Sequence, residues 1–118
     1  MDNETVRSFC LSLPHATEGI QWGNDLLFRV GGKMFAVIAL EPSASNRLAF
    51  KCTPEKFEEL IELDGIIPAP YMARNKWISL QRFDALKGSE IKDLIRNSYE
   101  MVFQKLPKKV QEQLKQSV

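Results

Sequence analysis

Residues 25–40 read Asp-Leu-Leu-Phe-Arg-Val-Gly-Gly-Lys-Met-Phe-Ala-Val-Ile-Ala-Leu, and this stretch decides the fold. Two apolar runs meet at Gly31-Gly32. A tight two-residue hairpin turn requires positive φ at both central positions, which glycine adopts without steric cost. The pattern therefore predicts a β-hairpin with strands at residues 25–30 and 33–40.

Two more strands are predicted outside the hairpin, at residues 46–52 and 77–81. Helical signals precede, separate and follow the strands. The resulting order is α-β-β-β-α-β-α-α. This order predicts an α+β domain in which helices pack on one face of an antiparallel sheet.

The predicted helices have recognisable starts. An apolar stripe at i, i+3, i+4 and i+7 indicates a helix over residues 3–13, capped by Asp2 or Asn3. Thr53-Pro54-Glu55 is typical of a helix N-terminus, and Gly65 is expected to end that helix. Ser89 is expected to cap a long helix that reaches residue 105, and Pro107 opens a short basic one.

Strand alternation predicts which side chains share a face of the sheet. In a two-residue hairpin Val30 and Lys33 face each other, which places Val37 on the same face as Phe28 and Phe35. If the apolar sets face the helices, the open face is mixed basic, polar and aromatic. It then carries Arg29, Arg47, Lys51, Trp77, Ser79 and Gln81.

Composition bounds the class of protein. The 118 residues suit one domain, with 44% hydrophobic and 26% charged residues. No apolar run reaches a membrane span and no signal peptide is evident, so a cytoplasmic protein without membrane contact is expected. Cys10 and Cys52 lie in apolar patterns and are expected to be buried free thiols.

The net charge of +1 hides an asymmetry. Residues 1–70 carry six Lys/Arg and ten Asp/Glu, whereas residues 71–118 carry ten and five. The basic C-terminal portion is compatible with an anionic partner.

The segment at residues 68–77 reads Pro-Ala-Pro-Tyr-Met-Ala-Arg-Asn-Lys-Trp. Its prolines exclude a helix and favour a defined loop that presents cationic and aromatic groups. A contact surface is therefore expected here.

Catalytic and cofactor chemistry find little support. His15 is the single histidine, and no nucleophile motif accompanies it. Gly31-Gly32-Lys33 lies in a hairpin and lacks the phosphate-loop pattern, and no metal-ligand spacing occurs. An enzyme is the least favoured class, and no cofactor or metal is expected. Trp22 is either an aromatic lid over the hairpin or a stacking ring for a ligand.

Several landmarks together resemble the MmcQ/YjbR family of small bacterial proteins. They include Gly-Lys-Met-Phe-Ala at residues 32–36, Trp77 after the Pro-Ala loop, and Ser98-Tyr99-Glu100. The resemblance covers nearly the whole chain and implies a CyaY-like, frataxin-like fold. It also implies DNA binding through a "double-wing" sheet surface. A histidine that many members carry just before the tryptophan is absent here, while Arg74 and Lys76 keep positive charge in the loop.

Two functions follow as hypotheses. The first is a non-enzymatic DNA-binding protein, expected as a monomer, with contacts from Arg29, Lys33, Arg47, Lys51, Arg74, Lys76 and Trp77. The alternative is a small-molecule or protein-interaction module with an aromatic pocket formed by Trp22, Tyr71 and Tyr99. A continuous positive surface would favour the first, and an aromatic cavity with few polar groups would favour the second.

Overall fold

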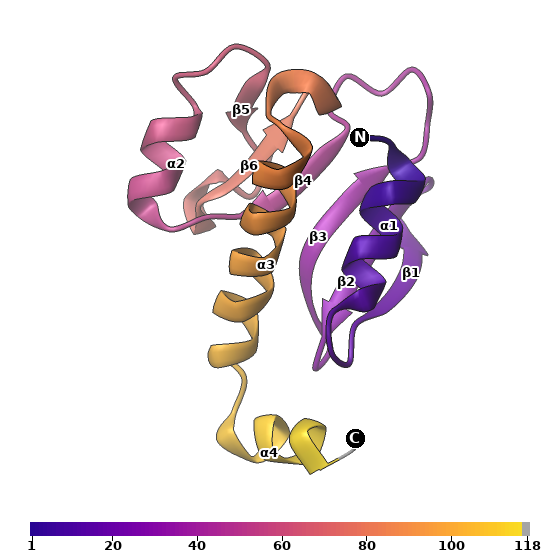
Figure 1. Ribbon diagram of the computed structural model, residues 1–118, viewed down its shortest axis with the longest axis vertical. Coiled ribbons are helices and arrows are strands. Elements are labelled where there is room, and N and C mark those ends of the chain that lie inside the picture. Colours follow the sequence, from indigo (N-terminus) through magenta and orange to yellow (C-terminus); the bar gives the residue numbers. More distant parts are fainter. Residues whose placement is uncertain (117–118) are drawn as a thin grey trace.

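The computed structural model describes residues 1–116 and has the α+β architecture that the sequence predicts (Figure 1). One six-stranded sheet and four α-helices make up the described chain, with short 3₁₀ turns at Ala73–Asn75 (η1) and Phe83–Ala85 (η2). The strands are β1 (Thr17–Gln21), β2 (Asp25–Val30), β3 (Lys33–Ala39), β4 (Leu48–Lys51), β5 (Ile66–Pro68) and β6 (Trp77–Leu80). The helices are α1 (Asn3–Ser12), α2 (Pro54–Leu60), α3 (Gly88–Gln104) and α4 (Lys108–Gln116).

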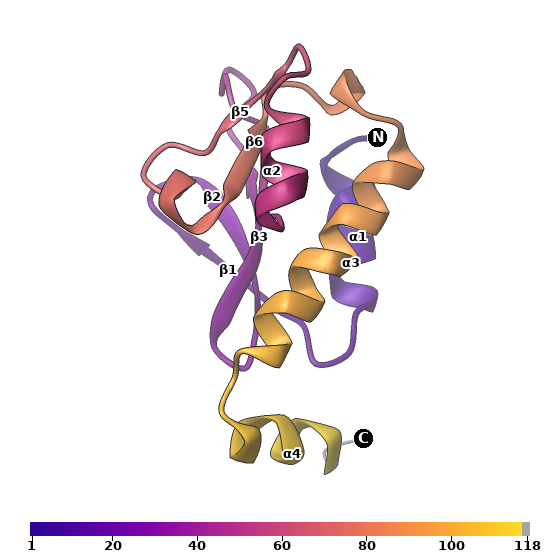
Figure 2. The same cartoon turned by 90° about the vertical axis from the view of Figure 1, so that its left-hand side faces the viewer.

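The sheet is antiparallel throughout, with strand order β1-β2-β3-β4-β6-β5. Helices α1 and α3 cover one face, and the main core lies between them and the sheet (Figure 2). The other face carries no α-helix and is flanked by loops, one of which contains η1 (Figure 2). Helix α4 lies beyond the C-terminal end of α3 (Figure 1), and its Leu114 packs against the main core. Across residues 1–116, none of the helices combines the length and apolar character that crossing a membrane requires.

Helix starts follow the predicted capping chemistry in two cases. The Asp2 carboxylate accepts a hydrogen bond from Thr5 N at 2.8 Å, and Thr53 Oγ1 accepts one from Lys56 N at 3.2 Å. The third case is a correction, because the N-cap of α3 is Lys87 and its side chain makes no capping bond. Ser89 therefore lies inside the first turn of α3.

The sequence patterns missed two strands, β1 and β5. All residues of β1 except one are exposed, so the strand has no alternation of apolar and polar residues in the sequence. It is recognised as a strand only by its pairing with β2. Strand β5 has three residues and ends in Pro68. Both are edge strands, where short length and proline are common because one side needs no partner.

A β-bulge in β3 corrects the predicted alternation. Val30 pairs with Lys33 as expected, but Arg29 pairs with Met34 and Phe28 with Ala36, so Phe35 is an extra residue. Beyond the bulge, each β3 side chain lies on the face of the sheet opposite to the one that simple alternation predicts. Val37 therefore lies on the open face, and Ile38 joins the core against the helices.

Ser98 of α3 closes the gap that the bulge leaves. Its side chain is fully buried, and its Oγ donates to Phe35 O at 2.6 Å while accepting from Lys51 N at 3.1 Å. The last β3–β4 backbone pair is Ala36 with Phe50. One hydroxyl thus ties two strands to each other and to α3.

Candidate functional site

The open face of the sheet is hollowed where small residues line up across three strands. Val37, Ala49 and Ser79 are neighbours in register on β3, β4 and β6. Alanine and serine leave space that larger residues would fill. Leu27 and Trp77 pack beside this row in a second apolar cluster, separate from the core under the helices. Trp77 is only 5% exposed, so its ring supports the floor.

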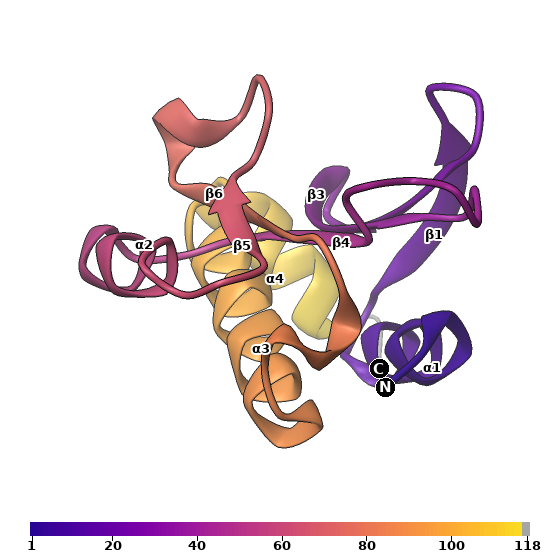
Figure 3. The ribbon, with the colours of Figure 1, turned by 90° about the horizontal axis from the view of Figure 1, so that it is seen from above.

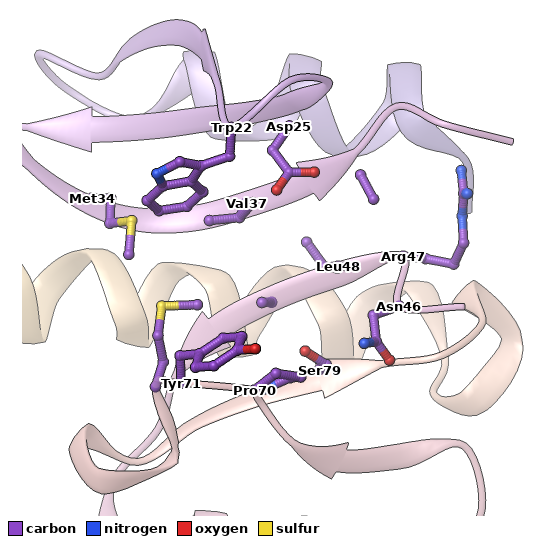
Figure 4. Close-up of a pocket in the computed structure, with 13 residues that line it drawn as sticks. Trp22, Asp25, Met34, Val37, Asn46, Arg47, Leu48, Pro70, Tyr71 and Ser79 are labelled. Atoms are coloured by element: carbon purple, nitrogen blue, oxygen red, sulfur yellow. The ribbon is translucent and has the colours of Figure 1, made fainter. Parts of the chain in front are cut away.

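Two projections rise on either side of this floor, and we call the space between them the two-winged cleft. One wing is the β1–β2 turn, which carries Trp22, and the other is the loop at residues 69–76, which carries Tyr71 (Figure 3). Both wings project from the face opposite α1 and α3. Figure 4 shows the two rings on opposite sides of the floor. Trp22 is 63% exposed and Tyr71 is fully exposed.

Both wing aromatics have a left-handed backbone conformation. The φ angle is 53° at Trp22 and 66° at Tyr71. Tyr71 is the third residue of a turn in which Met72 N bonds to Ala69 O at 3.1 Å, a position that favours glycine or asparagine. Bulky residues rarely adopt positive φ, and such strain concentrates at binding sites.

The polar groups of the two-winged cleft gather near one end and offer hydrogen-bond acceptors. Asn46 Oδ1 is buried and makes no hydrogen bond within the described residues. Asp25 also lines the cleft, and partial burial raises the pKa of its carboxyl. Ser79 contributes a hydroxyl close to Asn46 (Figure 4). These acceptors suit a ligand that brings N–H or O–H donors.

The two-winged cleft measures about 620 Å³ and is lined mainly by apolar side chains, including Met34 and Met72. Ligand sites commonly have this size and this combination of apolar walls with a few polar groups. Methionine adapts its shape and contacts aromatic rings favourably. The space can therefore hold a flat ring between the wings with its polar edge toward Asn46.

The residues predicted to contact DNA do not form one surface. Arg29 lies on the open face across Gly19, with Nη1 3.6 Å from where a glycine Cβ would stand, and Lys33 is exposed at the β2–β3 turn. Arg47 donates to Glu41 O at 2.7 Å and turns away from both rings (Figure 4). Its guanidinium also lies 5.9 Å from the centre of the Phe83 ring. Trp77 is buried beside the floor and does not line the two-winged cleft.

The remaining three predicted contacts converge elsewhere. Lys51, Arg74 and Lys76 line a second hollow beside the start of α2, together with Lys105 at the end of α3. We call this hollow the basic pocket. The loop at residues 68–77 borders both sites, because Tyr71 and Met72 face the two-winged cleft while Arg74 and Lys76 face the basic pocket.

Tyr99, grouped with Trp22 and Tyr71 in the sequence hypothesis, lies on the helix side of the sheet. Its hydroxyl donates to Pro14 O at 2.6 Å, and its ring meets Phe35 edge-on at 5.3 Å. Helix α3 packs on the face opposite the two-winged cleft, so Tyr99 cannot line it. His15 sits in the loop beside Tyr99, with φ at 63°.

The two thiols are buried and free. Burial raises the pKa of Cys10 and of Cys52 to about 12. They are therefore protonated and poorly nucleophilic near neutral pH. Within residues 1–116, no three His, Cys, Asp or Glu side chains are grouped as metal ligands would be.

Sequence reasoning did not single out Asn46, Asp25, Met34 or Met72. The bulge that turns Val37 into the floor has no sequence signature in this hairpin. Asn46 precedes a strand in a loop, where asparagine is ordinary. The signal that did exist was Trp22 beside Gly23, because a bulky residue next to glycine marks a turn that exposes its ring.

Comparisons with known proteins agree with this fold. A family model described as YjbR matches residues 11–101. The crystal structure of a Deinococcus radiodurans protein with a DUF419 domain superposes with a TM-score of 0.83. The two chains are 26% identical over 94% of this chain and 86% of that chain. A Pseudomonas syringae structure shares the fold, with a TM-score of 0.72 and 20% identity over 86% of this chain and 99% of that one. No functionally curated protein matches.

Proposed function

The chain belongs to the YjbR family, and from the geometry of its open sheet face we propose that it is a non-enzymatic binding protein. In this proposal a small planar ring enters the two-winged cleft and stacks against Trp22 and Tyr71. The family supplies the fold, whereas the function rests on the cleft.

The observation that carries the proposal is the pair of exposed aromatic rings on strained backbone. Exposure of Trp22 and Tyr71 leaves apolar surface in water, and positive φ adds a further cost at each residue. Neither cost benefits packing in the free protein. A ligand ring that covers both surfaces would recover free energy from burial and stacking.

The acceptors at one end of the two-winged cleft define the edge of the ligand. Asn46 Oδ1 lacks a partner within residues 1–116, and a buried acceptor without a partner is costly. Asp25 and Ser79 add further acceptor capacity. A heteroaromatic ring with N–H donors, such as a nucleobase-like ring, would bond to Asp25 and Ser79 while its faces stack on the wings, and it would reach Asn46 Oδ1, which is closed to solvent in the free protein, once that side chain turns toward the cleft.

Adenine is a suitable probe, and N6,N6-dimethyladenine is its matched analogue without the exocyclic donors. We expect saturable adenine binding, followed through tryptophan emission, because Trp22 is exposed and Trp77 is buried. The dimethyl analogue should bind about tenfold more weakly, as expected for loss of one hydrogen bond to a buried acceptor.

Three variants test whether adenine binds in the two-winged cleft. Trp22→Ala and Tyr71→Ala should each abolish adenine binding. Calorimetry measures binding by both variants, because Trp22→Ala removes the exposed tryptophan whose emission reports it. Ile20→Ala is the matched control, because Ile20 is also an exposed apolar residue on β1 but does not line the cleft. Equal loss in all three variants, or no binding of either probe by the wild-type protein, would contradict the proposal.

DNA binding is a second candidate, and the basic pocket is the observation that favours it. Lys51, Arg74 and Lys76 lie close together there and could contact phosphates. Arg29, Lys33 and Arg47 lie apart from this group, which favours a short single strand over a duplex. Salt-dependent binding of an oligonucleotide, weakened by an Arg74→Ala/Lys76→Ala double variant, would support this candidate. Unchanged affinity in that variant would count against it.

A further inference from the structure

The basic pocket brings four cationic side chains together from separate parts of the chain. Lys51 comes from β4, Arg74 and Lys76 from the η1 turn and its C-cap, and Lys105 from the C-cap of α3. The hollow measures about 520 Å³, and no Asp or Glu lines it. Like charges converge here without a carboxylate to offset them.

The cations of the basic pocket form no ion pair with a carboxylate, as is true of most Lys and Arg side chains in residues 1–116; what sets them apart is that they line one hollow. Throughout residues 1–116 the ion pairs involve Arg7, Lys56, Arg82 and Arg96, and none includes a cation of the basic pocket. Lys51 Nζ donates only to a backbone carbonyl, Asn75 O, at 3.2 Å. Burial and the nearby charge of Lys105 lower the pKa of Lys51. The free protein therefore bears an electrostatic cost at this place.

The backbone around the basic pocket is fixed in an unusual shape. Lys76 has φ at 66°, in the left-handed region. Its N–H donates to Ala73 O at 2.9 Å, and its carbonyl accepts from Cys52 N at 2.9 Å. Lys76 Nζ lies 5.1 Å from the centre of the Phe57 ring. The strained residue is thus held at both backbone groups, with its ammonium group over an aromatic face.

We propose that the basic pocket binds a phosphate monoester carried by a small molecule. A monoester dianion matches several converging cations better than a diester does, because a diester carries one charge. Arginine supplies paired donors for phosphate oxygens, and lysines add point charges. Thr53 also lines the hollow, and its Oγ1 accepts from Lys56 N, so its own hydrogen can point to an acceptor. The inference is independent of the two-winged cleft.

Glycerol 2-phosphate is the probe, titrated by calorimetry at pH 8 and constant ionic strength adjusted with chloride. We expect saturable binding to the wild-type protein. The Arg74→Gln/Lys105→Gln variant removes two charges from the pocket but keeps long side chains, and it should weaken binding at least about tenfold. The Lys87→Gln/Lys109→Gln variant removes two charges outside the pocket and should change affinity less than about twofold.

Two further measurements separate the sources of phosphate and the two sites. An oligonucleotide that binds while glycerol 2-phosphate does not would overturn the monoester assignment in favour of a nucleic-acid backbone. Equal weakening of glycerol 2-phosphate binding in both double-Gln variants would overturn the proposal, because it would show nonspecific attraction between the phosphate and the positive charges of the protein. Trp22→Ala should leave glycerol 2-phosphate binding unchanged, so failure of the cleft proposal and failure of this inference are distinguishable.

Discussion

Tyr71 is fully exposed, yet it occupies a turn position that suits glycine or asparagine. We predict that Tyr71→Asn raises the free energy of unfolding by about 0.5–1 kcal/mol, because asparagine tolerates positive φ and no packed side chain is lost. The same change should abolish adenine binding. Tyr71→Phe is the matched control, since it keeps both the ring and the strain. Urea denaturation measures the stability, and a lower stability for Tyr71→Asn would contradict a functional origin of the strain.

Ser98 supplies a single hydroxyl that satisfies two backbone groups of the sheet. We predict that Ser98→Ala lowers the free energy of unfolding by about 1–3 kcal/mol, because Lys51 N–H and Phe35 C=O then lose their buried partner. Ser8→Ala, at an exposed position of α1, should change it by less than about 0.5 kcal/mol. Urea denaturation of the three proteins gives the comparison, and equal effects of the two changes would count against the bridging role.

The buried thiols predict a stability that falls at alkaline pH. Their pKa is raised from an ordinary value of 9.0 to about 12, so above pH 9 the unfolded chain releases protons that the folded chain still holds. The free energy of unfolding should therefore fall as pH rises from 9 toward 12, by at most about 1.4 kcal/mol per pH unit for each thiol. Burial also raises the pKa of Tyr99, which adds to the same trend at higher pH.

Denaturant titrations at pH 8, 9 and 10 measure this slope. A Cys10→Ala/Cys52→Ala variant should show a flatter dependence, whatever its stability at pH 8. A slope equal to that of the wild-type protein would show that other groups cause the alkaline loss.

Among the elements, the β2–β3 hairpin allows a test with two adjacent glycines. Both have positive φ, but a Cβ at Gly31 would come 2.5 Å from Leu106 Cδ1, whereas nothing lies within 4 Å at Gly32. We predict that Gly32→Ala costs about 1 kcal/mol from backbone strain and that Gly31→Ala costs more, because Leu106 is buried and must move. Thermal denaturation of both variants provides the measurement. A smaller cost at Gly31 would contradict packing of the hairpin tip against the end of α3.

The helices and strands also show which parts of this fold could be predicted from the sequence alone. Helix caps and the glycine turn follow from local chemistry, so the hairpin, α1, α2 and their starts were predictable from a few residues. Strands β1 and β5 depend on pairing with neighbours, and the bulge at Phe35 depends on Ser98, which lies 63 residues away. For the same reason Trp22 and Tyr71 could be nominated from sequence, whereas Asn46 and the floor at Val37 could not.

Across the whole molecule, one sheet serves two purposes. Helices α1 and α3 bury one face, and the bulge and the small residues shape the other into a cleft with two aromatic wings. Four cationic side chains line a separate hollow where β4 ends and β6 begins. The proline-containing loop at residues 68–77 borders both sites, so its defined shape can position an aromatic wing and a cationic pocket at once.

Intermolecular nuclear Overhauser effects between adenine ring protons and protein methyl groups test the central claim most directly. If a ring stacks in the two-winged cleft, H2 and H8 of adenine should show contacts to the methyl groups of Val37, Ala49, Met34 and Met72. An Ala49→Leu variant, which fills the floor, should lose these contacts while remaining folded. Contacts only to methyl groups on the helix side, such as those of Ile91 and Ile95, or binding without contact to the floor, would contradict the account.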